Sequence, residues 1–315
     1  MPSQLTGVML MAYGTPKNLD EVAPYYRSIR GSREPKKEEI DELRERYRKI
    51  GGSTPLLKIT QKVAKSLEME LNSAGTGKYR GYEGMKHWHP FIAETVSKMA
   101  KDGVNQIVAL PMAPHYSQMS IDGYKAAVSE AVGALPKPVP VRFIESWYQN
   151  PLFISVMAQR VKETLESTFG RGAAKKVEVI FSAHSLPRRI QKWDDPYPKE
   201  LLQSSEAVAK AANLTFWRFS YQSASHTGEP WLGPDILETL SDLARQNKLK
   251  VLSVPIGFMT DNLEILYDID AEAQELAKGL GMTLKRIEMM NDSPAFVKTL
   301  ANIVLTGEGA RASSF

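Results

Sequence analysis

Short apolar runs alternate with stretches of helical pattern along most of the chain. The apolar runs end in turn-forming or polar residues and cover 7–12, 106–110, 139–144, 177–181 and 250–254. The helical stretches cover 38–50, 59–71, 90–101, 123–134, 151–167, 198–211, 236–246 and 294–305. Strands joined by helices form right-handed crossovers and pair in parallel. The order therefore predicts an α/β fold built on parallel sheets with flanking helices.

A weak internal sequence repeat predicts two similar halves. Residues 12–16 resemble residues 183–187, and residues 111–115 resemble residues 255–258, each pair following an expected strand. A chain of 315 residues also exceeds the usual single-domain size. We expect two similar Rossmann-like domains with a cleft between them. The N-terminal domain would cover 1–135 and be joined by a C-terminal helix within 290–315. The C-terminal domain would cover 136–289, with the Pro-rich stretch 136–140 as the crossover.

Composition excludes several classes of protein. The sequence has no cysteine, which excludes disulfides, thiolate metal sites and cysteine-ligated iron–sulfur clusters. The net charge of +4 is modest and suits an acidic small molecule at least as well as nucleic acid, so we expect no nucleic-acid partner. No apolar run approaches the roughly 20 residues of a membrane span, and residues 1–6 lack a basic signal-peptide region. We expect a monomeric cytoplasmic enzyme.

A histidine follows one of the expected strands directly. The strand 177–181 continues through Ser182 and Ala183 to His184, and Pro187 stiffens the backbone beyond it. Open α/β sheets place their chemistry at the carboxyl ends of strands, and a neutral imidazole can bind a metal or accept a proton. We therefore interpret His184 as a functional residue.

Carboxylates recur every four residues in the segment after Asn262. They are Glu264, Asp268 and Glu272, which form one stripe on a helix. Beside an imidazole, such a stripe can handle divalent cations or protons. The same spacing is common on solvated helix faces, and this remains the alternative interpretation. We expect Leu263, Leu266 and Tyr267 to form the buried face of the helix.

The remaining histidines give weaker signals. His87 and His89 lie two residues apart before a helical stretch, a pattern divided evenly between a surface feature and a site. His115 follows another expected strand, and His226 lies in a loop of turn-forming residues. No dinucleotide or Walker motif follows any expected strand, which argues against a nucleotide enzyme.

Together these motifs resemble those of the ferrochelatase family, most closely the coproporphyrin III type of Gram-positive bacteria. The resemblance covers nearly the whole chain and implies a chelatase-type version of the Rossmann-like fold. The segments that match are 11–16, 25–26, 29–30, 46–47, 51–52, 86–87, 113–117, 182–187, 195–198, 231–235 and 263–268.

The resemblance implies a role for each matching side chain. His184 and Glu264 would hold the incoming Fe²⁺ and take protons from the pyrrole nitrogens, and Asp268 and Glu272 would be outer carboxylates of the metal path. Tyr13 would approach the iron from the opposite face. The residues implied to contact the macrocycle and its propionates are Arg30, Arg46, Tyr47, Thr54 and Tyr124, with His87 as a further polar cleft residue.

Two positions depart from the family pattern. Position 54 is more often Ser, and Thr54 retains the hydroxyl. The residue two before the expected catalytic glutamate is commonly His, but it is Asn262 in this chain. An amide cannot shuttle protons near neutral pH and is a weaker metal ligand than imidazole. Assistance from this position is therefore not expected.

The activity that the resemblance implies is insertion of Fe²⁺ into a porphyrin, most closely coproporphyrin III to give coproheme in haem b biosynthesis. Porphyrin and ferrous iron would be substrates, with no permanently bound cofactor and no iron–sulfur cluster. The alternatives are protoporphyrin IX as substrate, insertion of cobalt or nickel into another tetrapyrrole, and a non-catalytic porphyrin or haem carrier.

This chemistry makes a geometric prediction about the carboxylate stripe. The ring must be bent and must lose two N–H protons, so Arg30 and Arg46 would hold its remote carboxylates while His184 and Glu264 accept the protons. A spacing of four turns the stripe by about 40° per step on a regular α-helix, and a π-bulge would bring it closer to a line. We expect such a distortion near Glu264.

Overall fold

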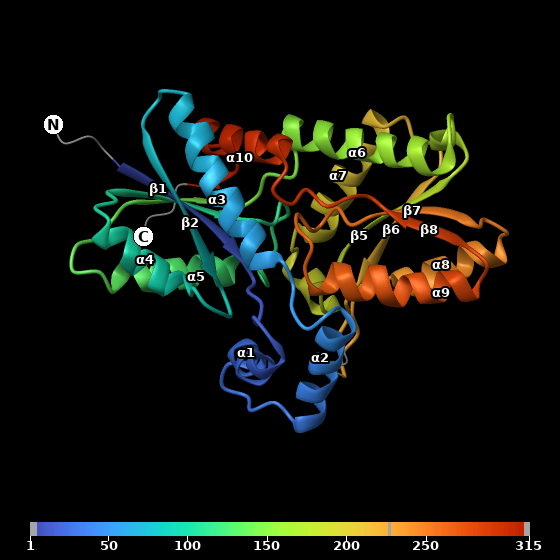
Figure 1. Ribbon diagram of the computed structural model, residues 1–315, viewed down its shortest axis with the longest axis horizontal. Helices are drawn as coiled ribbons and strands as arrows, with labels where there is room; N and C mark the ends of the chain where they lie inside the picture. Colours follow the sequence, from blue (N-terminus) through green and yellow to red (C-terminus); the bar gives the residue numbers. More distant parts are fainter. Residues whose placement is uncertain (1–4, 226–227, 312–315) are drawn as a thin grey trace. The chain divides into compact units, whose positions relative to one another are not determined.

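The computed structural model describes residues 5–225 and 228–311, and for residues 310 and 311 the backbone alone. The chain divides into two compact units, Met1–Trp147 with Met290–Phe315, and Tyr148–Met289. Each unit is built on one sheet with helices on both faces (Figure 1). Within the described residues, no helix is both long enough and apolar enough to cross a membrane.

The first unit contains a sheet in the order β2-β1-β3-β4-β9. Strands β1 to β4 pair in parallel, and β9 pairs antiparallel with β4. The elements are β1 (Leu5–Ala12), η1 (Leu19–Glu21), α1 (Val22–Arg30), α2 (Lys37–Lys49), α3 (Leu56–Ser73), β2 (Lys78–Met85), α4 (Ile92–Lys101), β3 (Gln106–Pro111), α5 (Ile121–Gly133), β4 (Val141–Ile144), α10 (Pro294–Thr306) and β9 (Ala310–Arg311). Helices α3 and α10 cover one face of the sheet, and α4 and α5 cover the other (Figure 1).

The second unit contains a fully parallel sheet in the order β6-β5-β7-β8. Its elements are α6 (Pro151–Phe169), η2 (Ala173–Lys175), β5 (Glu178–His184), η3 (Arg188–Trp193), α7 (Tyr197–Ala211), β6 (Trp217–Gln222), α8 (Ile236–Arg245), β7 (Lys250–Val254), η4 (Ile265–Ala273), α9 (Gln274–Gly279) and β8 (Thr283–Arg286). Helices α6 and α7 cover one face, and α8 and α9 cover the other (Figure 1). The predicted α/β class with parallel sheets is confirmed.

The inner strands are apolar because helices cover both of their faces. In the first unit, Met9, Met11 and Ala109 of β1 and β3 pack in one cluster with Val96 and Met99 of α4, and all five are fully buried. A strand buried on both faces has a nearly continuous apolar sequence. Both inner strands β1 and β3 were therefore recognisable from the sequence.

The strands that the sequence pattern missed are β2, β6, β8 and β9, and each lies at the edge of its sheet. Strand β2 contains two glycines, and its first four residues are exposed or half-buried. An edge strand has a neighbour on one side only, so it can retain polar residues. These strands therefore lack the apolar run on which the prediction depended.

The boundary between the two units follows strand β4. The expected boundary at residue 135 placed this strand in the C-terminal domain, whereas β4 pairs with β3 in the first sheet. The Pro-rich stretch 136–140 consequently lies inside the first unit. The C-terminal segment from Met290 also belongs to the first unit, where α10 packs against α3.

Helix η4 is a π-helix over Ile265–Ala273, which confirms the predicted distortion. Its buried apolar residues repeat every four positions: Ile265, Ile269 and Ala273 are fully buried, and Ala277 of α9 continues the row. A π-helix has a wider turn than an α-helix, with hydrogen bonds between residues five apart. The wider turn keeps this row against the core. The prediction that Leu263, Leu266 and Tyr267 form the buried face was wrong, because all three are only half-buried.

Candidate active site

Four of the polar residues singled out from the sequence follow the carboxyl ends of parallel strands, two in each unit. Tyr13 follows β1 and His87 follows β2 in the first unit. His184 ends β5, and Glu264 lies in the segment after β7, in the second unit. Loops at this edge of a parallel sheet commonly supply the functional groups of α/β enzymes. The local fold of each unit therefore places two of its candidate residues at or beyond the carboxyl ends of its strands.

His184 has a defined tautomer. Its Nδ1 lies within hydrogen-bond distance of the carbonyl oxygen of Ser185, and a carbonyl oxygen can only accept. Nδ1 is therefore the donor, and in the neutral ring Nε2 keeps the lone pair. The ring also lies 6.3 Å from the ring of Trp231, centroid to centroid. His184 thus offers a basic nitrogen for a metal ion or a proton.

Tyr197 supports the backbone at His184. Its hydroxyl donates to the carbonyl oxygen of His184 at 3.0 Å. Burial raises the pKa of the Tyr197 hydroxyl far above its ordinary range, and the neighbouring Tyr221 and Asp195 raise it further. The phenol therefore remains protonated and remains a donor. The sequence analysis did not select Tyr197, although it noted the segment 195–198 as a motif.

Asn262 caps the helical turn that contains Glu264. Its side-chain oxygen accepts from the backbone N–H of Ile265 at 2.9 Å, and its carbonyl oxygen accepts from Leu266 N at 3.0 Å. Asn is among the preferred capping residues, because its short side chain satisfies a backbone donor that the helix leaves unpaired. The residue that departs from the family pattern therefore has a structural role.

The carboxylate row passes from partial burial to solvent. Glu264 is half-buried, Asp268 is 6% exposed, and Glu272 is exposed. The hydroxyl of Ser223 donates to Asp268 Oδ2. Within the part of the chain that the structure describes, no three His, Asp or Glu side chains form a ready-made metal site. The four residues expected to handle metal therefore do not form one compact metal site.

A different carboxylate anchors the same helix. Asp270 receives two hydrogen bonds from the guanidinium of Arg286, at 2.8 and 2.7 Å. Arg286 also lies 3.2 Å from Asp261, which precedes the helix. This bidentate pairing fixes η4 against β8 and keeps Asp270 distinct from the carboxylate row.

In the first unit, Tyr13 and His87 lie against one another. Their ring centroids are 4.5 Å apart, and Tyr13 is 41% exposed. His87 Nδ1 donates to the carbonyl oxygen of Ser28 at 3.3 Å. Burial and the neighbouring charge of Lys86 lower the pKa of His87 to about 4, although the Ser28 contact opposes this. His87 is therefore neutral at physiological pH.

Lys86 lies over the ring of Tyr124. Its Nζ is 5.1 Å from the ring centroid and 3.5 Å from the carbonyl oxygen of Ser120. Burial lowers the pKa of the Lys86 ammonium group. A cation over an aromatic face is attracted by the ring quadrupole. Tyr124 is 8% exposed and packs in the core of the first unit, so most of its surface is already covered.

Three hydroxyls form a chain near the end of β1. Thr54 donates to Thr15 Oγ1 at 2.9 Å, and the Thr15 hydroxyl lies 3.3 Å from the Tyr47 hydroxyl. Tyr47 is 1% exposed, whereas Thr54 is half-buried. The structure thus joins Tyr47 and Thr54 through Thr15, a residue that the sequence analysis did not select.

The two arginines expected to hold propionates both have acidic partners. Arg30 ends α1, donates to the Tyr26 hydroxyl, and lies 3.6 Å from Glu39. Arg46 on α2 pairs with Glu42 one turn earlier at 2.9 Å. Both arginine side chains are partly exposed, at 27% and 32%. Ion pairs of solvent-exposed side chains contribute little energy.

Comparison with known proteins decides the family. The ferrochelatase family model matches residues 5–308. The chain belongs to the ferrochelatase family. A ferrochelatase of Herpetosiphon aurantiacus is 46% identical over 97% of the chain and 100% of the relative's length. Coproporphyrin III ferrochelatases of Halalkalibacterium halodurans and Bacillus subtilis are 39% and 37% identical, over 96% and 97% of the chain and 97% and 98% of their own lengths.

Solved chelatases share the fold of this ferrochelatase family member. SirB from Bacillus subtilis with Fe³⁺ aligns with a TM-score of 0.60 over 98% of the chain and 99% of its own. CbiX, described as the terminal enzyme of sirohaem biosynthesis in denitrifying bacteria, aligns with a TM-score of 0.54 over 96% and 98%. Both are 11% identical to the chain, so they show the fold alone. The predicted chelatase-type fold is confirmed.

The remaining histidines of this ferrochelatase family member differ in environment. His115 is 2% exposed, and burial lowers its pKa to about 3, so it is a neutral core residue. His89 is exposed and contacts both oxygens of Glu94 at 2.9 and 3.0 Å. His226 lies outside the described residues.

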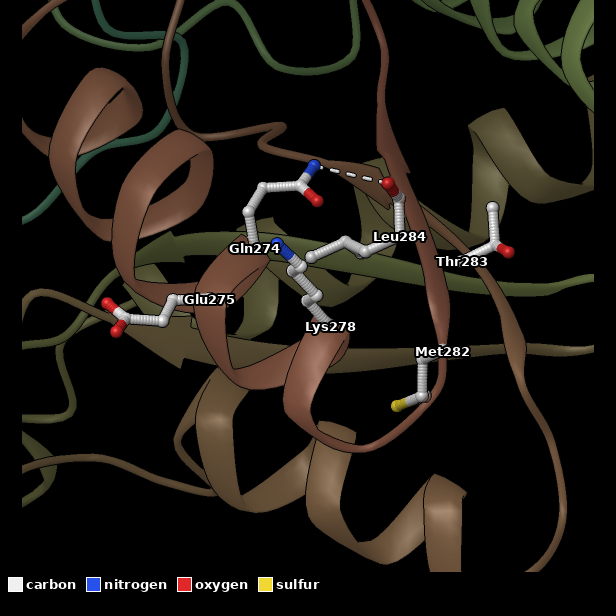
Figure 2. A pocket seen from close by; sticks show the side chains of 6 residues that line it. All are labelled: Gln274, Glu275, Lys278, Met282, Thr283 and Leu284. Carbon is white, nitrogen blue, oxygen red and sulfur yellow. Dashed lines mark hydrogen bonds between the residues drawn. The ribbon is translucent and has the colours of Figure 1, made fainter.

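A surface hollow lies between α9 and β8. Figure 2 shows its lining residues, among which Gln274 donates to the carbonyl oxygen of Leu284 at 3.1 Å. The lining residues are Gln274, Glu275, Lys278, Met282, Thr283 and Leu284. Among the described residues, its lining includes no histidine and none of the residues selected from the sequence. The strand-end residues are therefore the better candidates for the active site of this family member.

Proposed function

We propose that this chain catalyses insertion of Fe²⁺ into coproporphyrin III, giving coproheme for haem b biosynthesis. The reaction exchanges one Fe²⁺ for two pyrrole N–H protons. The observation that supports this proposal most directly is that the second unit offers both an imidazole nitrogen and a row of carboxylates. In its neutral form His184 keeps a lone pair on Nε2, and Glu264 directly precedes the π-helix that contains Asp268 and Glu272.

The proposed chemistry assigns a step to each group of the second unit. An imidazole nitrogen and a carboxylate oxygen both bind divalent iron and both accept protons. His184 and Glu264 replace water around the arriving ion and receive the pyrrole protons. Asp268 and Glu272, one buried and one exposed, pass cations inward or protons outward along the wide turns of η4.

The first unit supplies porphyrin recognition in this proposal. Arg30 and Arg46 exchange their glutamate partners for propionates, which form charge-assisted hydrogen bonds with guanidinium groups. Thr54 offers a hydroxyl whose geometry Thr15 and Tyr47 fix. Tyr13, exposed and packed on the neutral His87, meets the metal. Lys86 and Tyr124 extend this polar set.

Two lines of support favour coproporphyrin III over protoporphyrin IX. Relatives 37–40% identical over nearly the full chain are named coproporphyrin III ferrochelatases. Four propionates also need more polar partners than two, and the first unit offers Arg30, Arg46, Thr54 and Tyr124. We propose further that iron is solely a substrate, that no resident cofactor takes part, and that the enzyme acts as a cytoplasmic monomer.

An anaerobic insertion assay tests the proposal. Fe²⁺ is supplied with coproporphyrin III or protoporphyrin IX, and metallation is followed by absorbance in the wild type and in His184→Ala. Faster metallation of coproporphyrin III, lost in the variant, is the expected result. Faster metallation of protoporphyrin IX would contradict coproporphyrin III as the preferred substrate. Tight porphyrin binding without metallation would overturn the activity and favour a carrier.

A further inference from the structure

We propose that Gln222 is a positioning residue that holds Glu264 in register with His184. The inference rests on the proposed function for those two side chains. Gln222 is selected for its place at the end of β6, and no feature of the sequence pattern indicates it. Gln222 does not touch the reacting atoms in this proposal, because its contacts are with the backbone and with Ser182.

The position of Gln222 is set by the sheet. It is the last residue of β6 and stands opposite His184 in the parallel register of β5 and β6. It is completely buried, with 0% of its surface exposed. A fully buried amide must satisfy its polar atoms within the protein, because an unpaired polar group in the interior is strongly unfavourable.

The contacts of Gln222 reach both candidate catalytic segments. Its backbone carbonyl accepts from Ser185 N at 2.7 Å, directly after His184. Its side-chain Nε2 donates to the carbonyl oxygen of Glu264 at 3.4 Å. Its Oε1 accepts from the hydroxyl of Ser182 at 2.9 Å, and Ser182 is also fully buried. One residue therefore joins strand β5, the His184 loop and the start of the π-helix.

The hydrogen-bond pattern fixes the orientation of the amide. The Glu264 carbonyl oxygen can only accept, so the nitrogen of the Gln222 amide must face it. The amide oxygen then faces Ser182, whose hydroxyl acts as the donor. Ser182 lies two residues before His184 on β5, so both side chains lie on one face of the sheet. The orientation of this network is consequently tied to the face on which His184 lies.

Positioning matters because proton transfer depends steeply on distance. A displacement of about 1 Å in a reacting group can lower a rate by roughly 100-fold. The contact at 3.4 Å is long for a hydrogen bond, so its loss should move Glu264 by less than that. We expect loss of the amide to lower kcat by about 10-fold while porphyrin binding stays unchanged, because the proposed porphyrin contacts lie elsewhere.

The test compares Gln222→Met with Ser220→Ala. Methionine keeps the length of the side chain and removes the amide, whereas Ser220 is an equally buried residue of the same strand, bonded to Thr239 at 2.7 Å. Measurements are kcat, the KM for Fe²⁺, the pH profile of kcat, porphyrin affinity by fluorescence quenching, and thermal unfolding. Gln222→Met should lower kcat and shift the pH profile, and Ser220→Ala should change stability alone.

Each outcome decides the inference. A Gln222→Met enzyme with the wild-type kcat and pH profile, measured beside an inactive His184→Ala, would overturn the role of Gln222 and leave the proposed function intact. A wild-type enzyme that inserts no iron would instead overturn the proposed function.

If Gln222→Met does not fold, Ser182→Ala provides a second test, because it removes only the hydroxyl that orients the amide. It should then lower kcat about 3-fold with unchanged porphyrin affinity, and an unchanged kcat would again overturn the inference.

Discussion

The two units hold their candidate residues by different means. In the second unit, His184 and Glu264 are held by backbone contacts to two buried residues, Tyr197 and Gln222, and by the half-buried cap Asn262. In the first unit, Arg30 and Arg46 are long, partly exposed side chains paired with glutamates. The difference fits the two tasks proposed for these residues. Proton transfer needs atoms held within fractions of an ångström, whereas recognition of charged substituents tolerates adaptable side chains.

The largest expected effect comes from Glu264→Gln. The variant keeps the shape and the backbone contacts of the side chain but removes its basic oxygen. Because general acid–base groups contribute roughly 10²–10⁴-fold to a rate, kcat for iron insertion should fall by that factor, with porphyrin affinity unchanged. Glu275→Gln is the matched control, since Glu275 is an exposed carboxylate of α9 in the same unit. Equal loss in both variants would contradict a specific role for Glu264.

A smaller effect, on binding rather than on turnover, is expected for Arg30→Ala. Hydrogen bonds to charged groups contribute about 1.5–3 kcal/mol, which predicts a coproporphyrin KM raised by roughly 10- to 100-fold with kcat little changed. Arg33→Ala is the control, because Arg33 is more exposed and pairs with the same Glu39. Affinity measured by fluorescence quenching separates the two. Unchanged affinity in Arg30→Ala would refute contact with a propionate.

A pH dependence of stability distinguishes the first unit in another way. The folded pKa of His87, about 4, lies below its ordinary value of 6.5. Between these values the unfolded chain binds a proton that the folded chain does not, so the free energy of unfolding falls as the pH falls from 6.5 to 4. One such group contributes at most about 1.4 kcal/mol per pH unit. In His87→Asn, the free energy of unfolding, measured with urea at several pH values in this range, should change less steeply with pH. The difference from the wild type should be about 1.4 kcal/mol per pH unit. The same slope in both proteins would contradict the assignment.

The smallest effect is expected for the helix cap. Loss of an N-cap side chain destabilises a protein by about 1 kcal/mol, so Asn262→Ala should lower the free energy of unfolding by that amount. Asn262→Asp keeps the oxygen that accepts from Ile265 N and should lose much less. Thermal and urea unfolding of the three proteins provide the comparison. Equal stability of the alanine and aspartate variants would show that the cap contributes nothing.

The sequence predicted the fold class and the π-distortion because these depend on repeated patterns. Inner strands such as β1 and β3 have apolar sequences, and carboxylates four apart mark the wide helical turn. Edge strands were missed because their solvated side leaves them polar, as in β2. The second row of period four, Ile265, Ile269 and Ala273, is the signal that would have identified the buried face of η4 correctly.

The candidate residues were predicted as a set, but their supports were not. Thr15 and Gln222 are joined to the selected residues by contacts across the fold, Thr15 to Thr54 and Gln222 to Glu264. Such contacts join residues about forty positions apart, and no local pattern in the sequence indicates them. The burial of Tyr47 and Tyr124 could likewise not be predicted from the sequence, because it depends on how α2 and α5 pack.

The π-helix has a consequence for how this protein can change. Wide helical turns pack less favourably than α-helical ones and persist where function retains them. Deletion of one residue within 265–273 would let the segment relax to an α-helix and would rotate every later side chain around the helix axis. Glu272 would move out of line with Glu264, and Ile269 and Ala273 would lose their common row against the core. The carboxylate row and the buried row therefore depend on the same wide turns, and a change of length here would disturb both at once.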